Sequence, residues 1–367
     1  MRIVVLGGAG DMGAETVRDL VRYSKATDIV IADKNVHAAE RLIKSLDTNK
    51  VRIREIDATS HDDLVRVMHG SSAVAGALGP FYRFERPIIE AAIEAGANYV
   101  SICDDHDAAE AALALDNIAR QEGRRILTGM GWTPGLSNLL ARRAYEELEE
   151  VESINIYWAA SAADSEGLAV ILHTMHIFTG KVTSFQDGRF INIKAGSGKE
   201  LVEFPPPMET VNTFHLGHPE PVTIPRYFEG VKEVTLKGGL AENYLNYLSR
   251  FVSALGLTQV QFTKQLIGHI LKTALPILPK KKKKNTSSIR VDVKGKRHGI
   301  NVTLSYAVTD KMRRLTGLPL SIGAMMMAGN KINRFGVFGP EADSAIDSKE
   351  FLKELEVRDI IVGQREI

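Results

Sequence analysis

The first 33 residues contain the pattern that most constrains the fold. A short hydrophobic strand, Arg2–Leu6, leads into the turn Gly8-Ala9-Gly10-Asp11-Met12-Gly13, and a predicted helix then connects to a second strand, Asp28–Ala32. The three glycines permit a tight turn, close approach of the backbone to a pyrophosphate, and close packing of the helix on the strand. The helix N-terminus would offer amides and a positive dipole to phosphate groups. The segment therefore predicts a dinucleotide-binding site, with this turn at the phosphates.

Asp33, at the end of the second strand, bears on which dinucleotide binds. A carboxylate twenty residues past Gly13 can bind the hydroxyls of the adenosine ribose, and it repels the 2′-phosphate of NADP. Lys34 beside it would instead attract that phosphate. We expect NAD as the cofactor and leave NADP open, with both residues near the adenosine ribose.

Charge and cysteine content limit the class of protein. The 46 lysines and arginines nearly balance the 45 aspartates and glutamates, so the overall charge gives no reason to expect nucleic acid as a partner. Cys103 is the single cysteine, which excludes an internal disulfide and fits a reducing cytoplasm. Met1 leads directly into the first strand, and no apolar run has the length of a membrane span. We expect a cytoplasmic protein.

Strands and helices alternate over residues 1–131. Helical patterns fill the gaps between the strands; in Arg86–Ala95, for example, Ile88, Ala91, Ala92 and Ala95 share one face before Gly96. This alternation predicts an α/β fold, a doubly wound parallel sheet of the Rossmann type. The predicted strands are Arg2–Leu6, Asp28–Ala32, Val51–Ile56, Ser72–Leu78, Asn98–Cys103 and Arg125–Thr128.

Longer strands and hairpins predict a second, α+β domain over residues 132–315, built on a mostly antiparallel sheet. A helical insert is expected at about residues 242–278. Residues 316–367 are expected to return and to pack partly on the first domain, with a helix at about Leu320–Asn330. The predicted strands are Ser153–Ala159, Val182–Ile193, Val222–Tyr227, Lys232–Leu236, Ile289–Val293 and Ile300–Val308, the last two joined by a turn at Gly295–Gly299.

Several motifs together resemble the saccharopine dehydrogenase (saccharopine reductase) family, which also includes lysine dehydrogenases. Besides the amino-terminal turn, they are Leu78-Gly79-Pro80, Ala95-Gly96-Ala97-Asn98-Tyr99-Val100, Thr133-Pro134-Gly135-Leu136-Ser137-Asn138, Thr316-Gly317-Leu318-Pro319, Met327-Ala328-Gly329 and Gly336-Val337-Phe338-Gly339-Pro340-Glu341. The resemblance implies NAD(P)-linked oxidation or reduction at a carbon that bears nitrogen, in an amino acid or its adduct. It also implies a substrate site between two domains, and a homodimer.

The chain departs from the family pattern at two places that bear on the substrate more than on the fold. The family often has an aspartate directly before Pro134, where this chain has Thr133. It often has another aspartate near residue 101, where this chain has Ser101 and carries acids later, at Asp104 and Asp105.

Further cofactor residues are expected where the third and fourth strands end, because these ends line the cofactor crevice of a Rossmann domain. Asp57 and Ala58 should lie near the adenine, and Leu78-Gly79-Pro80 near the pyrophosphate and the nicotinamide ribose. The alternatives are that Asp57 caps the following helix and that Gly79-Pro80 is an ordinary turn.

The segment after the fifth strand, Cys103-Asp104-Asp105-His106, is the candidate for acid–base chemistry. Hydride transfer at carbon needs a group that manages the proton on the neighbouring nitrogen or oxygen, and Asp104 or His106 could do so. Alternatively, Asp105 and Asp107 cap a helix at Ala108–Arg120. Cys103 fits a packing role better than a nucleophilic one, because it ends a buried strand.

Three residues are candidates for contact with an amino-acid-like substrate. The helix start at Thr133–Asn138 offers amides to a carboxylate, which makes Asn138 a candidate, and Trp132 could form a wall or pack in the core. Arg226, preceded by His215, His218 and Glu220, could bind a carboxylate or form a surface ion pair. We expect no metal site, although His173 and His176 share a helical face.

The functional hypothesis is a NAD(P)-dependent oxidoreductase that acts on the C–N bond of an amino acid or imine conjugate. One alternative is alcohol or sugar dehydrogenation on the same scaffold. Another is a regulatory or membrane-associated adaptor that binds dinucleotide without turnover, since the run Lys280–Lys284 follows an apolar helix. We expect this run to be a solvated loop rather than a membrane contact.

Overall fold

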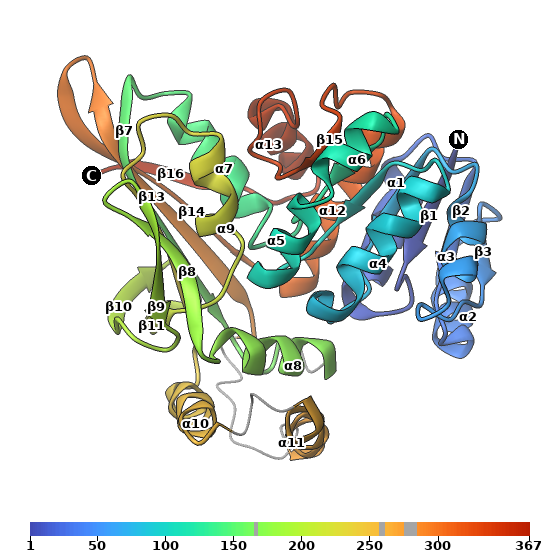
Figure 1. The fold of residues 1–367 in the computed structure, drawn as a ribbon, viewed down its shortest axis with the longest axis horizontal. Helices are drawn as coiled ribbons and strands as arrows, with labels where there is room; N and C mark the ends of the chain where they lie inside the picture. The colour runs from blue at the N-terminus through green and yellow to red at the C-terminus, as the bar shows by residue number, and fades with distance from the viewer. Residues whose placement is uncertain (165–167, 257–260, 275–284) are drawn as a thin grey trace. The chain divides into compact units, whose positions relative to one another are not determined.

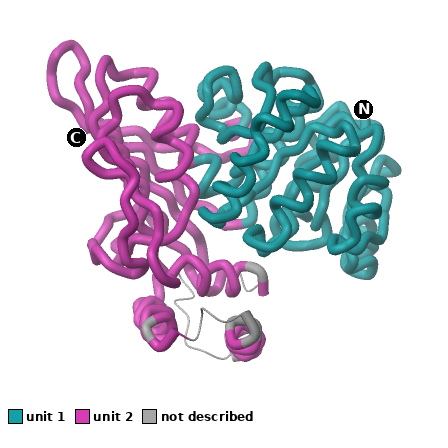
Figure 2. Tube along the Cα trace, in the orientation of Figure 1, with its two compact units in different colours: residues 1–136, 313–354 teal, residues 137–312, 355–367 magenta. Residues whose placement is uncertain are grey.

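A computed structural model describes residues 1–164, 168–256, 261–274 and 285–367. The chain forms two compact units (Figure 2). Residues 1–136 and 313–354 form the first, and residues 137–312 and 355–367 form the second. The division after Leu136 lies a few residues beyond the expected boundary at 131, and the last residues, 355–367, belong to the second unit. Among the described helices, none combines the length and the apolar composition of a membrane span.

The first unit contains a parallel sheet in the order β15-β6-β5-β4-β1-β2-β3 (Figure 1). All described pairs in it are parallel, and strands such as β1 and β2 are buried along nearly their whole length. The predicted doubly wound Rossmann sheet is therefore confirmed. Its strands are β1 (Arg2–Leu6), β2 (Asp28–Ala32), β3 (Val51–Arg54), β4 (Ala73–Gly76), β5 (Tyr99–Ser101), β6 (Arg125–Leu127) and β15 (Gly336–Phe338).

Helices connect these strands, and α4 packs between α3 and α5. The expected helix at Leu320–Asn330 is the second half of α12, which begins earlier, and β15 and α13 were not predicted. The helices of this unit are α1 (Asp11–Tyr23), α2 (Val36–Lys44), α3 (His61–Met68), α4 (Phe81–Glu94), α5 (His106–Leu113), α6 (Asp116–Gln121), α12 (Met312–Ala328) and α13 (Ser348–Glu356).

Two predicted helices of the first unit have different bounds in the structure. The helix expected at Arg86–Ala95 begins earlier, at Phe81, because Asp105 Oδ2 accepts a hydrogen bond from Tyr82 N at 2.9 Å. This cap comes from a residue distant in sequence, so local patterns do not reveal it. The helix expected at Ala108–Arg120 is two helices, α5 and α6.

The second unit contains a mixed sheet in the order β10-β11-β12-β7-β13-β14-β16, with β8 pairing β12 and β9 pairing β8. Among the described pairs of this sheet only β7 and β12 are parallel, so the predicted mostly antiparallel sheet is confirmed. Its strands are β7 (Glu150–Ala160), β8 (Lys181–Gln186), β9 (Arg189–Lys194), β10 (Glu200–Phe204), β11 (Glu209–His215), β12 (Glu233–Leu240), β13 (Ser287–Arg297), β14 (Ile300–Asp310) and β16 (Gly363–Glu366).

Turn residues explain two differences from the predicted strands. The strand expected at Val182–Ile193 is the hairpin β8–β9, because Asp187 and Gly188 adopt positive φ angles of 50° and 71° and reverse the chain. The β13–β14 turn lies at His298 and Gly299, with φ angles of 53° and 74°, rather than across Gly295–Gly299. The hairpin β10–β11 and the strand β16 were not predicted.

The prediction of a strand at Val222–Tyr227 is wrong. These residues form helix α9 (Glu220–Thr223) and the 3₁₀ helix η1 (Ile224–Arg226). Pro221 and Pro225 lack the amide hydrogen that a strand ladder requires, and both occupy first-turn positions of these helices.

The remaining helices of the second unit include the predicted insert. It forms α10 and α11, and α11 packs against α8, which contains the predicted helical face of His173 and His176. Residues 275–278 of the expected insert, and Lys280–Lys284, lie outside the described residues. The helices are α7 (Leu136–Tyr145), α8 (Leu168–Ile177), α10 (Asn243–Ala254) and α11 (Gln261–Ala274).

Helix α12 packs closely on α1 at Gly317, which gives a stability prediction. A Cβ atom at Gly317 would lie 2.8 Å from Met12 O and 2.9 Å from the Cβ of Glu15, and Thr16 Oγ1 donates to Gly317 O at 3.0 Å. We expect Gly317→Ala to lower the free energy of unfolding by about 1–3 kcal/mol, measured by denaturant titration. Helix propensity alone would make alanine more stable, so a stabilised variant would contradict this packing.

Candidate functional site

The glycine turn between β1 and α1 has the close backbone packing that its sequence predicts. A Cβ atom at Gly13 would lie 2.2 Å from Gly7 O, so only glycine allows α1 to approach the strand end this closely. Gly10 is exposed, and its amide donates to Gly7 O at 3.1 Å. Gly10, as the N-cap residue, places the first amides of α1 beside the turn. These features fit the pyrophosphate of a dinucleotide.

Asp33 lies directly against this turn. Its Oδ2 accepts a hydrogen bond from Ala9 N at 3.0 Å, and its Oδ1 accepts one from Asn35 N at 2.9 Å. A carboxylate is therefore fixed next to the phosphate-binding turn, where the adenosine ribose of a dinucleotide would lie. The Lys34 side chain is exposed.

The other predicted cofactor residues follow β3 and β4. Asp57 is exposed and accepts hydrogen bonds from the amide and hydroxyl of Thr59, which hold the pKa of its carboxyl below the usual value. The cap of α3 is Ser60, whose Oγ accepts from Asp63 N, so the alternative that Asp57 caps this helix is wrong. Ala58, Leu78, Gly79 and Pro80 are half-buried, with Pro80 at the start of α4.

A fully buried acid, Glu85 of α4, lies beside the ends of β5 and β6. Ser101 Oγ donates to its Oε1 at 2.6 Å, Thr128 Oγ1 donates to the same oxygen at 3.1 Å, and Tyr99 OH donates to its Oε2 at 3.0 Å. Burial raises the pKa of Glu85 to about 7, although the three hydroxyl groups oppose the rise.

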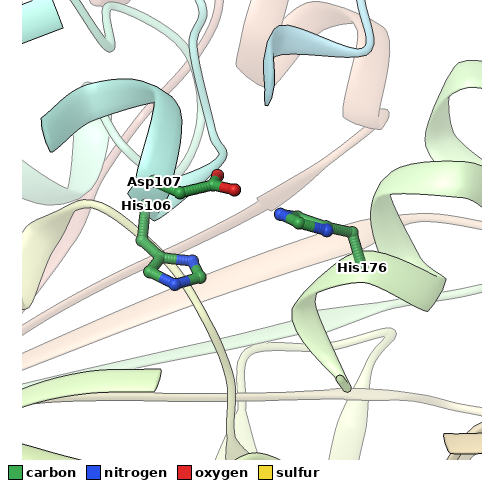
Figure 3. Close-up of side chains that lie close together, drawn as sticks. All are labelled: His106, Asp107 and His176. Atoms are coloured by element: carbon green, nitrogen blue, oxygen red, sulfur yellow. The ribbon is translucent and has the colours of Figure 1, made fainter. Parts of the chain in front are cut away.

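The segment expected to supply acid–base groups surrounds a second buried acid. Asp105 is fully buried, and its side chain turns toward α4, where it accepts from Tyr82 N. Asp104 and His106 are half-buried. Figure 3 shows His106 and Asp107 on the first turn of α5 and His176 on α8.

Cys103 does not have the properties of a nucleophile. Its thiol is fully buried, and burial together with the acids Glu85 and Asp105 raises its pKa well above the usual value. A thiol held in this way stays protonated and unreactive, which agrees with a packing role.

A second group of buried polar residues lies in the second unit, at the start of α7 and around α9. Ser137 Oγ donates to Glu220 Oε1 at 2.7 Å, and Asn138 Nδ2 donates to Thr223 Oγ1 at 3.3 Å. The other carboxylate oxygen of Glu220 lies 3.8 Å from Nδ1 of His218. The His218 ring contacts the rings of His173 and Trp158, at centroid distances of 5.3 and 5.9 Å.

The three predicted substrate residues have different environments. Trp132 is 7% exposed and Asn138 is fully buried. Arg226 is exposed in η1 rather than in a strand, and its Nε donates to Val222 O at 3.0 Å.

The sequence analysis did not predict the buried hydrogen bonds of Glu85, Ser137 and Glu220. A signal for Glu85 was present, because it precedes Ile88, Ile89 and Ala92 by three, four and seven residues and so shares their buried helical face. An acid on an apolar helical stripe is unusual and marks a candidate site. Glu220 had no such signal, since the segment after it was expected to be a strand.

The strand order β3-β2-β1-β4-β5-β6, with the glycine turn after β1, defines a nicotinamide-dinucleotide-binding domain. Residues 3–127 match the family model described as saccharopine dehydrogenase NADP binding domain, and residues 169–361 match saccharopine dehydrogenase C-terminal domain. The chain therefore belongs to the saccharopine dehydrogenase family. It is a NAD(P)-binding oxidoreductase of that family.

Two individual proteins resemble the chain over nearly its whole length. Carboxyaminopropylagmatine dehydrogenase from Synechocystis sp. is 23% identical, and the match covers 97% of this chain and 95% of the relative. Apo saccharopine dehydrogenase (L-Glu forming) from Saccharomyces cerevisiae has a similar structure, with a TM-score of 0.70 at 13% identity, covering 100% of this chain and 99% of the other. The second likeness concerns the fold alone.

Gly10 and Gly13 of the turn predict different effects of the same substitution. Gly10 has a φ angle of −78°, and its Cβ would lie at an ordinary 3.4 Å from Gly7 O, so Gly10→Ala should fold normally. Its methyl group would still block the pyrophosphate, and we expect the affinity for dinucleotide to fall at least about tenfold. Gly13→Ala should instead lower the melting temperature, because its Cβ meets backbone. Calorimetric binding and thermal unfolding separate the two, and unchanged affinity in Gly10→Ala would contradict the assignment.

The raised pKa of Glu85 predicts a pH dependence of stability. The rise from 4.5 to about 7 means that Glu85 favours the folded chain at low pH, and that this contribution is lost as the pH rises through about 7. Between about pH 5 and pH 8 the loss amounts to about 3 kcal/mol at most. Glu85→Gln should lack this decrease in the free energy of unfolding, whereas Glu90→Gln, at an exposed site on the same helix, should keep it. Equal pH profiles for both variants would contradict the assignment.

Proposed function

We propose that the protein is a dehydrogenase or reductase whose substrate is a secondary amine, in which an amino-acid-like group is joined to a second amine. The protein interconverts this secondary amine with a carbonyl compound and a free amine. The observation that carries this proposal is that both halves of the chain match the saccharopine dehydrogenase family while the first half keeps an intact dinucleotide turn. The names of both relatives describe dehydrogenases of nitrogen-containing compounds.

The reaction balances with the oxidised nicotinamide as electron acceptor. The carbon next to the bridging nitrogen loses a hydride and the nitrogen loses a proton, which gives an imine and the reduced cofactor. Addition of water to the imine and cleavage of the C–N bond then give the carbonyl compound and the free amine. The protein must therefore bind a carboxylate-bearing amine, move a proton at nitrogen, and admit one water molecule.

The residues of the chain divide these tasks in our proposal. Gly8–Gly13 and the N-terminus of α1 hold the pyrophosphate, Asp33 holds the adenosine ribose, and the segment Leu78–Pro80 contacts the nicotinamide side of the cofactor. Asp104 or His106, at the end of β5, moves the proton. Asn138 and Arg226, which the sequence makes candidates, bind the substrate, and Trp132 forms part of its wall.

A substrate screen tests this proposal directly. Purified protein with NAD or NADP would be offered saccharopine, carboxyaminopropylagmatine, free amino acids, alcohols and sugars, and the absorbance of the reduced nicotinamide would be followed. We expect reduction of the cofactor with at least one secondary amine. Turnover with alcohols or sugars alone would support the alternative dehydrogenase, and dinucleotide binding without any turnover would support an adaptor. Either result would contradict the proposal.

Asp33 gives a prediction about the choice of cofactor, for which we propose NAD over NADP. Its carboxylate is held at the turn by Ala9 N and Asn35 N, where it would repel a 2′-phosphate. Asp33→Asn keeps the size of the side chain and removes the charge, so the affinity for NADP relative to NAD should rise about tenfold, or about 1.4 kcal/mol. Asp47→Asn, at an exposed site, should leave the ratio unchanged. A ratio unaffected by Asp33→Asn would contradict the preference.

A further inference from the structure

Glu85 lies at the edge of the sheet where a Rossmann domain would hold the nicotinamide end of a dinucleotide. The carboxyl ends of the parallel strands β4, β5 and β6 meet at one edge, and α4 begins there because it directly follows β4. Glu85 is one turn into α4, and its partners Ser101 and Thr128 stand at the ends of β5 and β6. In a Rossmann domain the ligand lies outside these strand ends.

The surroundings of Glu85 are built to hold a carboxyl group in either protonation state. Three hydroxyl groups contact its two oxygens, and a hydroxyl can donate to a carboxylate or turn to accept from a carboxylic acid. Tyr99 reaches Glu85 only because residue 76 is glycine, since a Cβ atom there would lie 2.2 Å from the Tyr99 oxygen. The surroundings of Glu85 therefore fit a buried carboxyl group whose hydrogen-bond partners can reorient.

In the described part of the chain, the titratable groups with the largest effects on Glu85 carry no positive charge. They are Tyr99 of β5, and Cys103 and Asp105 of the segment that follows β5. Asp105 adds to the rise in the pKa of Glu85, and Glu85 in turn raises the pKa values of Tyr99 and Cys103. A positive charge brought to this edge from outside would thus favour the ionised form of Glu85.

The oxidised and reduced forms of a nicotinamide cofactor differ by such a charge. The ring is positively charged when oxidised and neutral when reduced, and the rest of the cofactor is the same. Because the interior of the sheet edge screens charges weakly, a buried carboxylate distinguishes the two forms even without direct contact.

We propose that Glu85 sets the relative affinity for oxidised and reduced dinucleotide, by giving up its proton when the oxidised form binds and keeping it when the reduced form binds. In this role Glu85 acts through its charge and does not touch the substrate. This role rests on the proposed function only in requiring that a nicotinamide dinucleotide binds to the first unit.

Proton linkage gives the direction of the effect. The affinity for the oxidised cofactor should rise with pH through the range in which Glu85 titrates, by about tenfold for each unit by which the ring lowers the pKa. The affinity for the reduced cofactor should change little over the same range. The ratio of the two affinities is therefore the quantity that Glu85 controls.

Isothermal titration calorimetry tests this proposal without any turnover. NAD+, NADH, NADP+ and NADPH would be titrated into the intact chain between about pH 6 and pH 8, in buffers of different ionisation enthalpy, which report protons released on binding. In the native chain, we expect proton release with the oxidised forms and an affinity that rises with pH. Glu85→Gln should abolish both, and Glu90→Gln, at an exposed position of the same helix, should retain both.

A second variant keeps the test valid if Glu85→Gln does not fold. Thr128→Val removes one hydroxyl that favours ionised Glu85, so the midpoint of the pH dependence should move to higher pH. Equal proton release by both redox forms, or a midpoint that Thr128→Val does not move, would overturn the role of Glu85. Failure of every dinucleotide to bind at any pH would instead contradict the cofactor site itself, so the two failures are distinguishable.

Discussion

The close approach of α1 to the end of β1 is the constraint on which the first unit depends. Gly13 permits it, because a side chain there would meet the Gly7 carbonyl. The approach places the first amides of α1, the Asp33 carboxylate and the turn itself within one small region. The parallel order of the sheet then places the ends of β4, β5 and β6 on the neighbouring stretch of the same edge. Binding of a dinucleotide follows from this arrangement.

The local parts of this arrangement could be predicted from the sequence. The strands β1 and β2 have the predicted bounds, because hydrophobic runs and a glycine turn define them without reference to the rest of the chain. The bounds of α4 could not be predicted, since its first turn is fixed by Asp105 from beyond the next strand. The prediction for the segment around α9 was wrong for another reason. Its apolar residues suggested a strand, but Pro221 and Pro225 favour helical first turns.

The candidate site shows the same division. The glycines and Asp33 carry a local pattern, and the structure places them together. Glu85 could have been noticed as an acid on an apolar helical face, but its three hydroxyl partners come from β5 and from the residue that follows β6. The contact of Ser137 with Glu220 joins residues 83 positions apart, so no local pattern could reveal it. The surroundings of these charged groups depend on contacts between residues distant in sequence, and such contacts cannot be predicted from local patterns.

We propose that this chain transfers a hydride between a nicotinamide dinucleotide and a carbon that bears nitrogen. The most direct measurement follows a deuterium label. Saccharopine and carboxyaminopropylagmatine, each deuterated at both carbons next to the bridging nitrogen, would be incubated with the protein and oxidised cofactor, and the reduced cofactor would be analysed by mass spectrometry. Our account predicts that deuterium appears on the nicotinamide ring with at least one of these compounds. Bound cofactor that stays oxidised with both, or reduced cofactor without the label, would contradict it.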